Sequence, residues 1–130
     1  MAFLCLGCKG VCLMDVLDEL RGLGVDVDGG LKRVMGNEKL YRRLLGTFVK
    51  TAKNNEVQPD FDATDCTEII EKAHAIKGTA GNMSITPLFE AYSEILNLLR
   101  SGKPEEARTA LQKILPVQKE ILDCIERHME

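Results

Sequence analysis

Residues 66–99 read CTEIIEKAHAIKGTAGNMSITPLFEAYSEILNLL, and this stretch decides the fold. In its first half the apolar residues recur every three or four positions, the period of one helix face; they are Cys66, Ile69, Ala73, Ile76, Ala80 and Met83. Thr86 then offers an N-cap and Pro87 a first helical residue. The period resumes after them with Leu88, Tyr92, Ile95 and Leu99. The stretch therefore predicts two long amphipathic helices joined by a short turn.

The same period continues on both sides of this pair. Upstream, Asn37 is a candidate N-cap for a long helix with the apolar residues Leu40, Tyr41, Leu44, Leu45 and Phe48. Downstream, Gly102 ends one helix and Pro104 opens the last, whose apolar residues are Ala107, Leu111, Ile114, Leu115, Ile121, Leu122 and Ile125. Pro116 lies inside this last helix and is expected to kink it, because proline cannot donate a hydrogen bond to the carbonyl of Gln112.

Acidic residues mark one further helix start. Asp62 with Asp65, or Asp65 with Glu68, has the spacing of a capping box ahead of the helix that runs to about Met83.

Two short helices are expected before the long ones. The first ends at the glycines of residues 22–24 and has apolar residues at helical spacing, namely Leu13, Val16, Leu17 and Leu20. Asp28 is expected to cap the second, which contains Leu31 and Val34 and stops at Gly36. Together with the four long helices, this predicts an all-α fold: an antiparallel four-helix bundle with one or two short N-terminal helices.

The composition fits a single globular domain. The chain has 130 residues, of which 45% are hydrophobic and 28% charged, a balance unlike that of a disordered segment. A formal net charge of −3 argues against a nucleic-acid-binding surface over the whole domain, although a local basic patch stays open. The apolar runs are too short to span a bilayer, so no membrane partner is expected and the cytoplasm is the predicted location.

The beginning of the chain has its own character, because three of the five cysteines crowd into residues 1–13: Cys5, Cys8 and Cys12. A secretory signal is disfavoured, since the first positive charge, Lys9, follows the apolar residues instead of preceding them. A zinc or iron–sulfur site lacks a nearby fourth ligand. We expect residues 1–13 to form a leader of uncertain structure or an extra helical turn, and residues 14–130 to form the bundle domain. An odd number of cysteines excludes a complete disulfide framework and favours reduced thiols.

The residues that suggest chemistry lie beside the apolar stripe of residues 66–83. His74 is one position past Ala73, and four residues share its outer face at helical spacing: Ile70, Lys77, Gly78 and Gly81. Each mid-helix glycine costs about 1 kcal/mol relative to alanine. Because a bundle has no internal need for two glycines on a solvent face, the pattern predicts a docking face on which a partner approaches the helix backbone.

A histidine in this setting suits phosphoryl transfer. A neutral imidazole is nucleophilic through one ring nitrogen, and an ammonium group at Lys77 would offset charge on phosphoryl oxygens. The sequence contains no glycine-rich phosphate-binding loop, no convincing acidic metal cluster, and no Ser or Cys visibly paired with a His. The phosphoryl group is therefore expected to come from one protein and to leave to another, with no ATP site in this chain.

The run His74-Ala75-Ile76-Lys77-Gly78-Thr79-Ala80-Gly81-Asn82 resembles the signature of histidine-containing phosphotransfer (HPt) domains, in which His is followed by Lys-Gly, a small residue and a polar residue such as Asn. The upstream residues 36–48 resemble the preceding segment of bacterial members, and the resemblance extends over roughly residues 15–127. It implies that His74 is the phosphoacceptor, with Lys77 and Gly78 as supporting residues. Ile70, Gly81 and Asn82 are then expected to contact the partner.

The resemblance also implies the partners. These are the receiver domains of response regulators, which exchange the phosphoryl group through an aspartate, and a hybrid sensor kinase. The Mg²⁺ for the reaction belongs to the receiver, so no cofactor or metal is expected here. One residue departs from the family pattern: Ser84 stands where many members have Gly at the end of the helix.

Two other functions remain open at the level of sequence. The chain can be the dimerisation and phosphoacceptor part of a sensor histidine kinase, or a receiver-binding module whose histidine is not phosphorylated. Four long helices in one chain close a bundle without a second copy, whereas the kinase module supplies two per chain, so we expect a monomer.

The second histidine and two basic pairs are expected to have less specific roles. His128, near the C-terminus, is expected to be a solvated tail residue. The basic pairs at residues 32–33 and 42–43 either face solvent or orient an acidic partner.

Overall fold

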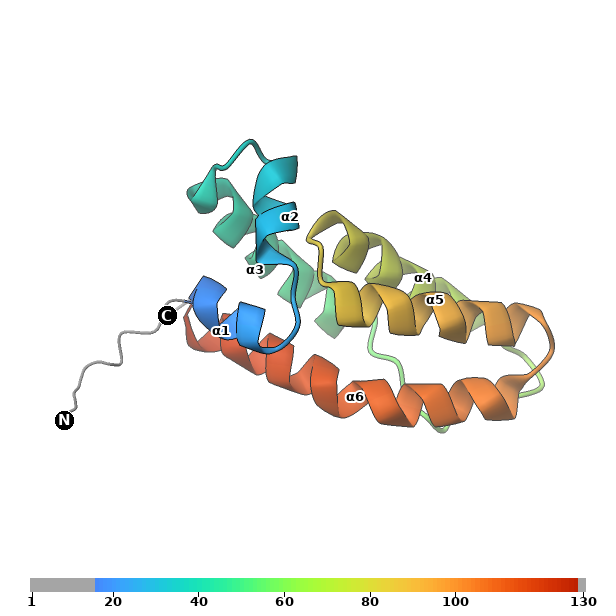
Figure 1. Ribbon diagram of the computed structural model, residues 1–130. Helices are drawn as coiled ribbons and strands as arrows, with labels where there is room; N and C mark the ends of the chain where they lie inside the picture. The colour runs from blue at the N-terminus through green and yellow to red at the C-terminus, as the bar shows by residue number, and fades with distance from the viewer. Residues whose placement is uncertain (1–15, 129–130) are drawn as a thin grey trace.

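The computed structural model describes residues 16–128, which form six α-helices and no strand (Figure 1). The two short ones are α1 (Val16–Gly22) and α2 (Val27–Arg33). The four long ones are α3 (Glu38–Asn54), α4 (Thr67–Asn82), α5 (Thr86–Arg100) and α6 (Pro104–Arg127). The all-α prediction is confirmed. The predicted leader, residues 1–13, and its three cysteines lie outside the described residues.

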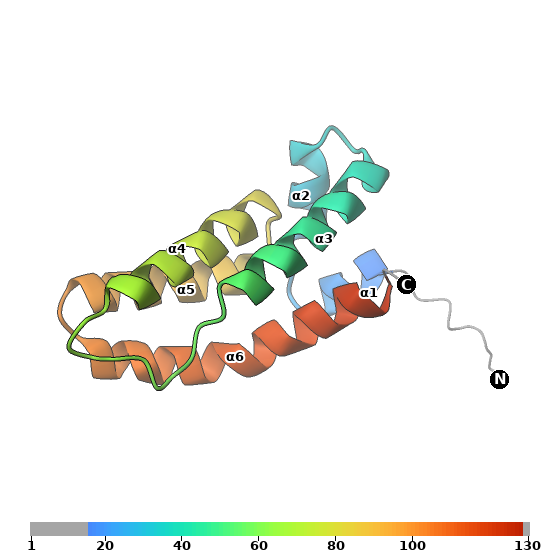
Figure 2. The same cartoon turned by 180° about the vertical axis from the view of Figure 1, so that it is seen from behind.

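The long helices close a four-helix bundle. Helix α4 packs against α5, α5 against α6, and α3 against both α4 and α6. Figure 2 shows the bundle from behind, with α3 leading down into the long connection before α4. The short helices cover one end, because α1 contacts α6 and α2 contacts α3. The expected antiparallel bundle with two short N-terminal helices is therefore the observed architecture.

Two tyrosines link helices inside the core. Tyr41 of α3 is fully buried, and its hydroxyl donates a hydrogen bond of 2.8 Å to the carbonyl of Met83, at the end of α4. Burial raises the pKa of Tyr41 to about 12, so the hydroxyl stays a donor at neutral pH. Tyr92 of α5 donates to the side chain of Gln118 on α6, which is itself buried. A buried polar group needs such a partner, so these contacts specify how the helices pack.

Helix α6 continues through Pro116. In Figures 1 and 2 the helix changes direction near its middle, as expected where proline removes one backbone hydrogen bond. Pro116 and Gln112 are both exposed, so solvent can bind the carbonyl of Gln112, which proline leaves without a donor.

The helix caps agree with the sequence in part. Asn37 caps α3 as expected, accepting from the backbone N–H of Leu40 at 3.1 Å. The expectation for Asp28 was wrong. Asp26 caps α2 and accepts from the N–H of Gly29 at 3.0 Å, while Asp28 lies in the first turn and pairs with Arg21. Both aspartates have the right chemistry for a cap, and only the path of the preceding turn distinguishes them.

The starts of α4 and α5 also differ from expectation. Among the described residues no reciprocal capping box forms at α4: Asp65 accepts from the N–H of Thr67, whereas Glu68 pairs with Lys72. At α5 the capping residue is Ile85 and not Thr86, which is already helical. The residue before α5 is fixed by the turn out of α4, so local propensity does not set this boundary.

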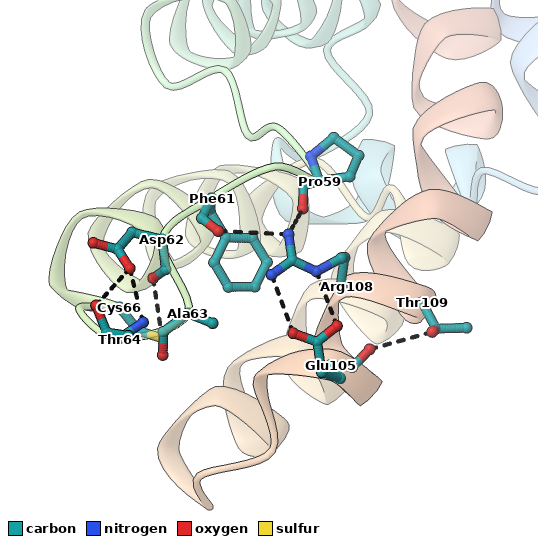
Figure 3. Close-up of polar contacts among 9 residues, drawn as sticks. All are labelled: Pro59, Phe61, Asp62, Ala63, Thr64, Cys66, Glu105, Arg108 and Thr109. Carbon is teal, nitrogen blue, oxygen red and sulfur yellow. Dashed lines mark hydrogen bonds and ion pairs between the residues drawn. The ribbon is translucent and has the colours of Figure 1, made fainter.

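The connection between α3 and α4 is pinned to α6 by Arg108 (Figure 3). The guanidinium donates to the backbone carbonyls of Pro59 and Phe61, lies 4.6 Å from the centroid of the Phe61 ring, and pairs with Glu105 at 3.3 Å. These carbonyls belong to a loop and have no neighbouring strand to supply backbone N–H donors, so an arginine with several donors is a suitable partner.

None of the helices between residues 16 and 128 is long and apolar enough to cross a membrane.

Candidate functional site

The packing of α4 leaves His74 outside the bundle. The helix buries one stripe of small and branched residues, Ile69, Ala73, Ile76 and Ala80, in the core. His74 follows Ala73 and is exposed. Within residues 16–128 its imidazole has no hydrogen bond or ion pair with another side chain, so both ring nitrogens are open to an incoming group.

Gly78, one turn further along α4, leaves the backbone uncovered. It is exposed, and a Cβ placed there would meet no atom of the described residues within 4 Å beyond the adjoining turns of its own helix. No internal contact therefore requires a glycine at this position. Its lack of a side chain leaves the surface beside His74 open.

Gly81 differs from Gly78, because the bundle does have an internal need for a glycine here, contrary to expectation. A Cβ at Gly81 would lie 3.0 Å from Cδ1 and 3.1 Å from Cε1 of Phe89. The ring of Phe89, from α5, thus packs directly on the backbone of α4. Gly81 is explained by this internal contact, and its predicted contact with a partner stays a prediction.

Phe89 is the residue that the sequence reasoning missed. It is 40% exposed, and the ammonium of Lys77 lies 5.7 Å from the centroid of its ring, in range of a cation–π contact. Its role could have been suspected from the sequence, because a large apolar residue stands one position away from the buried stripe of α5. Phe89 holds Lys77 over α5, next to the helix face that carries His74.

A hollow of about 380 Å³ lies beside these residues. Its lining includes Gly78, Gly81 and the exposed Asn82 from α4, Phe89 from α5, and Arg33 from α2. The structure thus brings Arg33, which the sequence left undecided, to the end of the candidate docking face. Arg42 lies elsewhere, near Val16 and His128. Ile70 is half-buried against the core one turn before His74.

The turn after α4 explains why glycine is favoured at the position of Ser84. The N–H of Ser84 donates to the carbonyl of Gly81, and the N–H of Ile85 donates to that of Ala80. This is the Schellman arrangement, which places the residue at the position of Ser84 in the left-handed region. Ser84 has φ of +56°, which glycine adopts with less strain.

We expect Ser84→Gly to raise the free energy of unfolding by up to about 1 kcal/mol. A left-handed backbone costs an L residue about 1–2 kcal/mol, and the freedom of glycine in the unfolded chain offsets about 0.5–1 kcal/mol of the gain. Urea unfolding measures the change. Ser93→Gly, inside α5, is the matched control and should destabilise the protein; a loss of stability in both variants would contradict the strain at Ser84.

His128 is exposed, as expected of a residue near the C-terminus, but it has a partner that was not expected. Its side chain is 29% exposed, and Nε2 lies 2.9 Å from the Glu19 carboxylate of α1. The fold brings the two together across 109 positions of sequence, which no local pattern reveals.

The comparisons with known proteins bear on the bundle and on α4. Residues 39–129 match the family model of the Hpt domain, which covers the four long helices and the motif at His74. The searches of curated proteins and of solved structures found no match. The match spans more than half of the chain, in agreement with the all-α bundle and the resemblance noted at residues 74–82. The chain therefore belongs to the Hpt domain family, whose members carry out histidine phosphotransfer with receiver domains in phosphorelay signalling.

Proposed function

We propose that this chain is a phosphorelay intermediate that carries a phosphoryl group on His74 between the aspartates of response-regulator receiver domains. The observation that supports the proposal best is the exposed imidazole on a helix face that Gly78 leaves uncovered. A receiver must bring a phosphoaspartate within bonding distance of the ring, and a side chain at position 78 would stand in its way.

The transfer is an exchange of one bond for another. The lone pair of a ring nitrogen of His74 attacks phosphorus, a P–N bond forms, and the P–O bond to the aspartyl carboxylate breaks with the electron pair leaving on the carboxylate. The reverse path passes the group to the next receiver. The Mg²⁺ that neutralises the phosphoryl oxygens is supplied by the receiver in this proposal, so the chain needs no cofactor of its own.

Lys77 is proposed to stabilise the transferred group, with Phe89 limiting where its ammonium lies. The ammonium shares the exposed side of α4 with His74 at a spacing of three residues, so it is next to the reacting group. The Lys77 ammonium lies 5.7 Å from the centroid of the Phe89 ring, which orients the cation without neutralising its charge. A fixed positive charge favours the transition state, in which charge spreads over the phosphoryl oxygens.

We expect Lys77→Ala to slow phosphoryl transfer about tenfold, equivalent to about 1.4 kcal/mol, while the free energy of unfolding changes by less than about 0.5 kcal/mol. Stopped-flow transfer at saturating receiver measures the rate. Lys77→Arg keeps the charge and should recover part of it. Lys113→Ala, at an exposed position on α6, is the matched control; equal rates for the parent and Lys77→Ala would remove Lys77 from the mechanism.

The partner surface is proposed to extend from His74 along α4 to the hollow beside Phe89. Ile70 lies at one end of it, and Gly81 and Asn82 lie at the other with Arg33 of α2. The mixture of an apolar ring and a cation suits a receiver domain, whose phosphorylated site is acidic and whose docking surface must exclude water. We propose a hybrid sensor kinase as the source of the phosphoryl group, and no nucleic acid or membrane as partner.

The simplest test is phosphoryl transfer from a phosphorylated receiver to the intact chain. The label should appear on this protein and should be lost in acid but survive base, as expected of a phosphoramidate. An unlabelled chain that still binds the receiver would support the alternative of a non-phosphorylated binding module.

Light scattering separates the other alternative, the dimerisation part of a sensor kinase. The four long helices of one chain already close around a single core, so we propose a cytoplasmic monomer. A stable dimer would instead favour the kinase module.

A further inference from the structure

Three potential metal ligands meet where α1 packs against the end of α6. Glu19 comes from α1, Cys124 from the last turn of α6, and His128 is the C-cap of α6. The Cys124 thiol donates to Glu19 Oε2 at 3.2 Å, His128 Nε2 lies 2.9 Å from the same oxygen, and one ligand atom from each residue falls within 4.8 Å of the others. None of the residues assigned to the candidate docking face on α4 belongs to this cluster.

The three groups differ in burial, from Cys124 in the core through half-buried Glu19 to His128 at the surface. Cys124 is fully buried, and the side chains of Glu19 and His128 are 22% and 29% exposed. The Glu19 carboxylate accepts from the Cys124 thiol and lies beside both His128 and Arg127, so the polar contacts of the cluster converge on one oxygen.

We propose that Glu19, Cys124 and His128 bind one Zn²⁺ ion, with water as the fourth ligand. Thiolate, imidazole and carboxylate are the ligands that zinc prefers. On binding, the Cys124 thiol gives its proton to solvent and the sulfur bonds to the metal. Coordinate bonds to the ion would link α1 to the end of α6 and stabilise this end of the bundle.

Two of the three distances between ligand atoms are close to those in a zinc site. Tetrahedral zinc with bonds of about 2.0–2.3 Å places its ligand atoms roughly 3.3–3.8 Å apart. The observed 3.2 and 2.9 Å therefore need to lengthen by a few tenths of an ångström. The remaining pair, Cys124 and His128, lies within 4.8 Å, and His128 is the C-cap of α6, so rotation of its side chain is the adjustment that an ion would require.

Arg127 is the group that opposes an ion. Its guanidinium lies 3.4 Å from the same oxygen of Glu19, and its side chain is 65% exposed. An exposed ion pair of this kind contributes little and can move into solvent. Replacing Arg127 should therefore strengthen metal binding. If Arg127 instead held the cluster together, replacing it would weaken metal binding.

The test uses the full chain with Cys5, Cys8 and Cys12 replaced by serine, so that these cysteines supply no thiolate. Co²⁺ is the probe, because thiolate and tetrahedral coordination give it characteristic charge-transfer and d–d absorption. We expect equimolar binding, displacement by Zn²⁺, and a melting temperature that rises with the logarithm of free Zn²⁺.

Single substitutions test which residues bind the ion. Glu19→Gln, His128→Gln and Cys124→Ser should each weaken Co²⁺ binding by at least about a hundredfold, the upper end of what losing even an outer-shell partner costs. Cys66→Ser, which removes the other described cysteine, should bind as the parent does, and Arg127→Gln should bind more tightly. Absence of the absorption, or binding unchanged in His128→Gln, would show that the three residues form only a hydrogen-bonded cluster. Phosphotransfer on His74 does not enter this readout.

Discussion

We expect His74→Gln to abolish acceptance of the phosphoryl group, with transfer falling below detection. Glutamine keeps a polar side chain of similar length but has no nucleophilic ring nitrogen, so no P–N bond forms. Because His74 is exposed and has no side-chain partner within residues 16–128, the substitution should leave folding unchanged. Incubation with a labelled phosphoreceiver, followed by mapping of the label, measures the effect.

His128→Gln is the matched control for this experiment, because it removes the second histidine of the chain. It breaks the contact with Glu19 at the far end of α6 and should transfer at the parent rate. Label on His74→Gln, or loss of label in His128→Gln at unchanged stability, would place the phosphoacceptor elsewhere.

The second large effect is expected at Gly78. Gly78→Leu should lower transfer at limiting receiver by at least about a hundredfold, equivalent to about 2.7 kcal/mol, because the new side chain projects from the open surface into the space of the partner. Gly78→Ala should instead stabilise α4 by up to about 1 kcal/mol. Transfer kinetics over a range of receiver concentrations, beside thermal unfolding, separate docking from stability.

Gly22→Leu is the control, since Gly22 also has open space around it but lies on α1. It should not affect transfer. If Gly78→Leu transfers at the parent rate while remaining folded, the surface beside His74 is not where the receiver docks.

Much of the fold was predictable because helix periodicity is a local property. The stripe from Ile69 to Met83 is buried as expected, and so are Leu88, Tyr92, Ile95 and Leu99. Asn37 was also correct as a cap, because an Asn followed by a continuous stripe leaves one reasonable helix start. The cap of α2 was misplaced because Asp26 and Asp28 are equivalent in the sequence and only the turn before the helix chooses between them.

The candidate site was predictable to the same extent. His74, Lys77 and Gly78 share one side of α4 because residues three and four apart are neighbours on any helix. Phe89 and Arg33 were not predictable as members of this surface, because they come from α5 and α2. The same holds for the packing of Phe89 on Gly81, which gives that glycine an internal role.

The sequence by itself thus determined that the chain is helical, where its long helices lie, and that His74 faces away from the apolar stripe. These properties follow from spacing along one helix. Only the tertiary structure decided that Lys77 lies over Phe89, that Ser84 takes a left-handed turn, and that Glu19 meets Cys124 and His128. Such contacts depend on which helices are neighbours and on their relative rotation, and core packing across the whole bundle sets both.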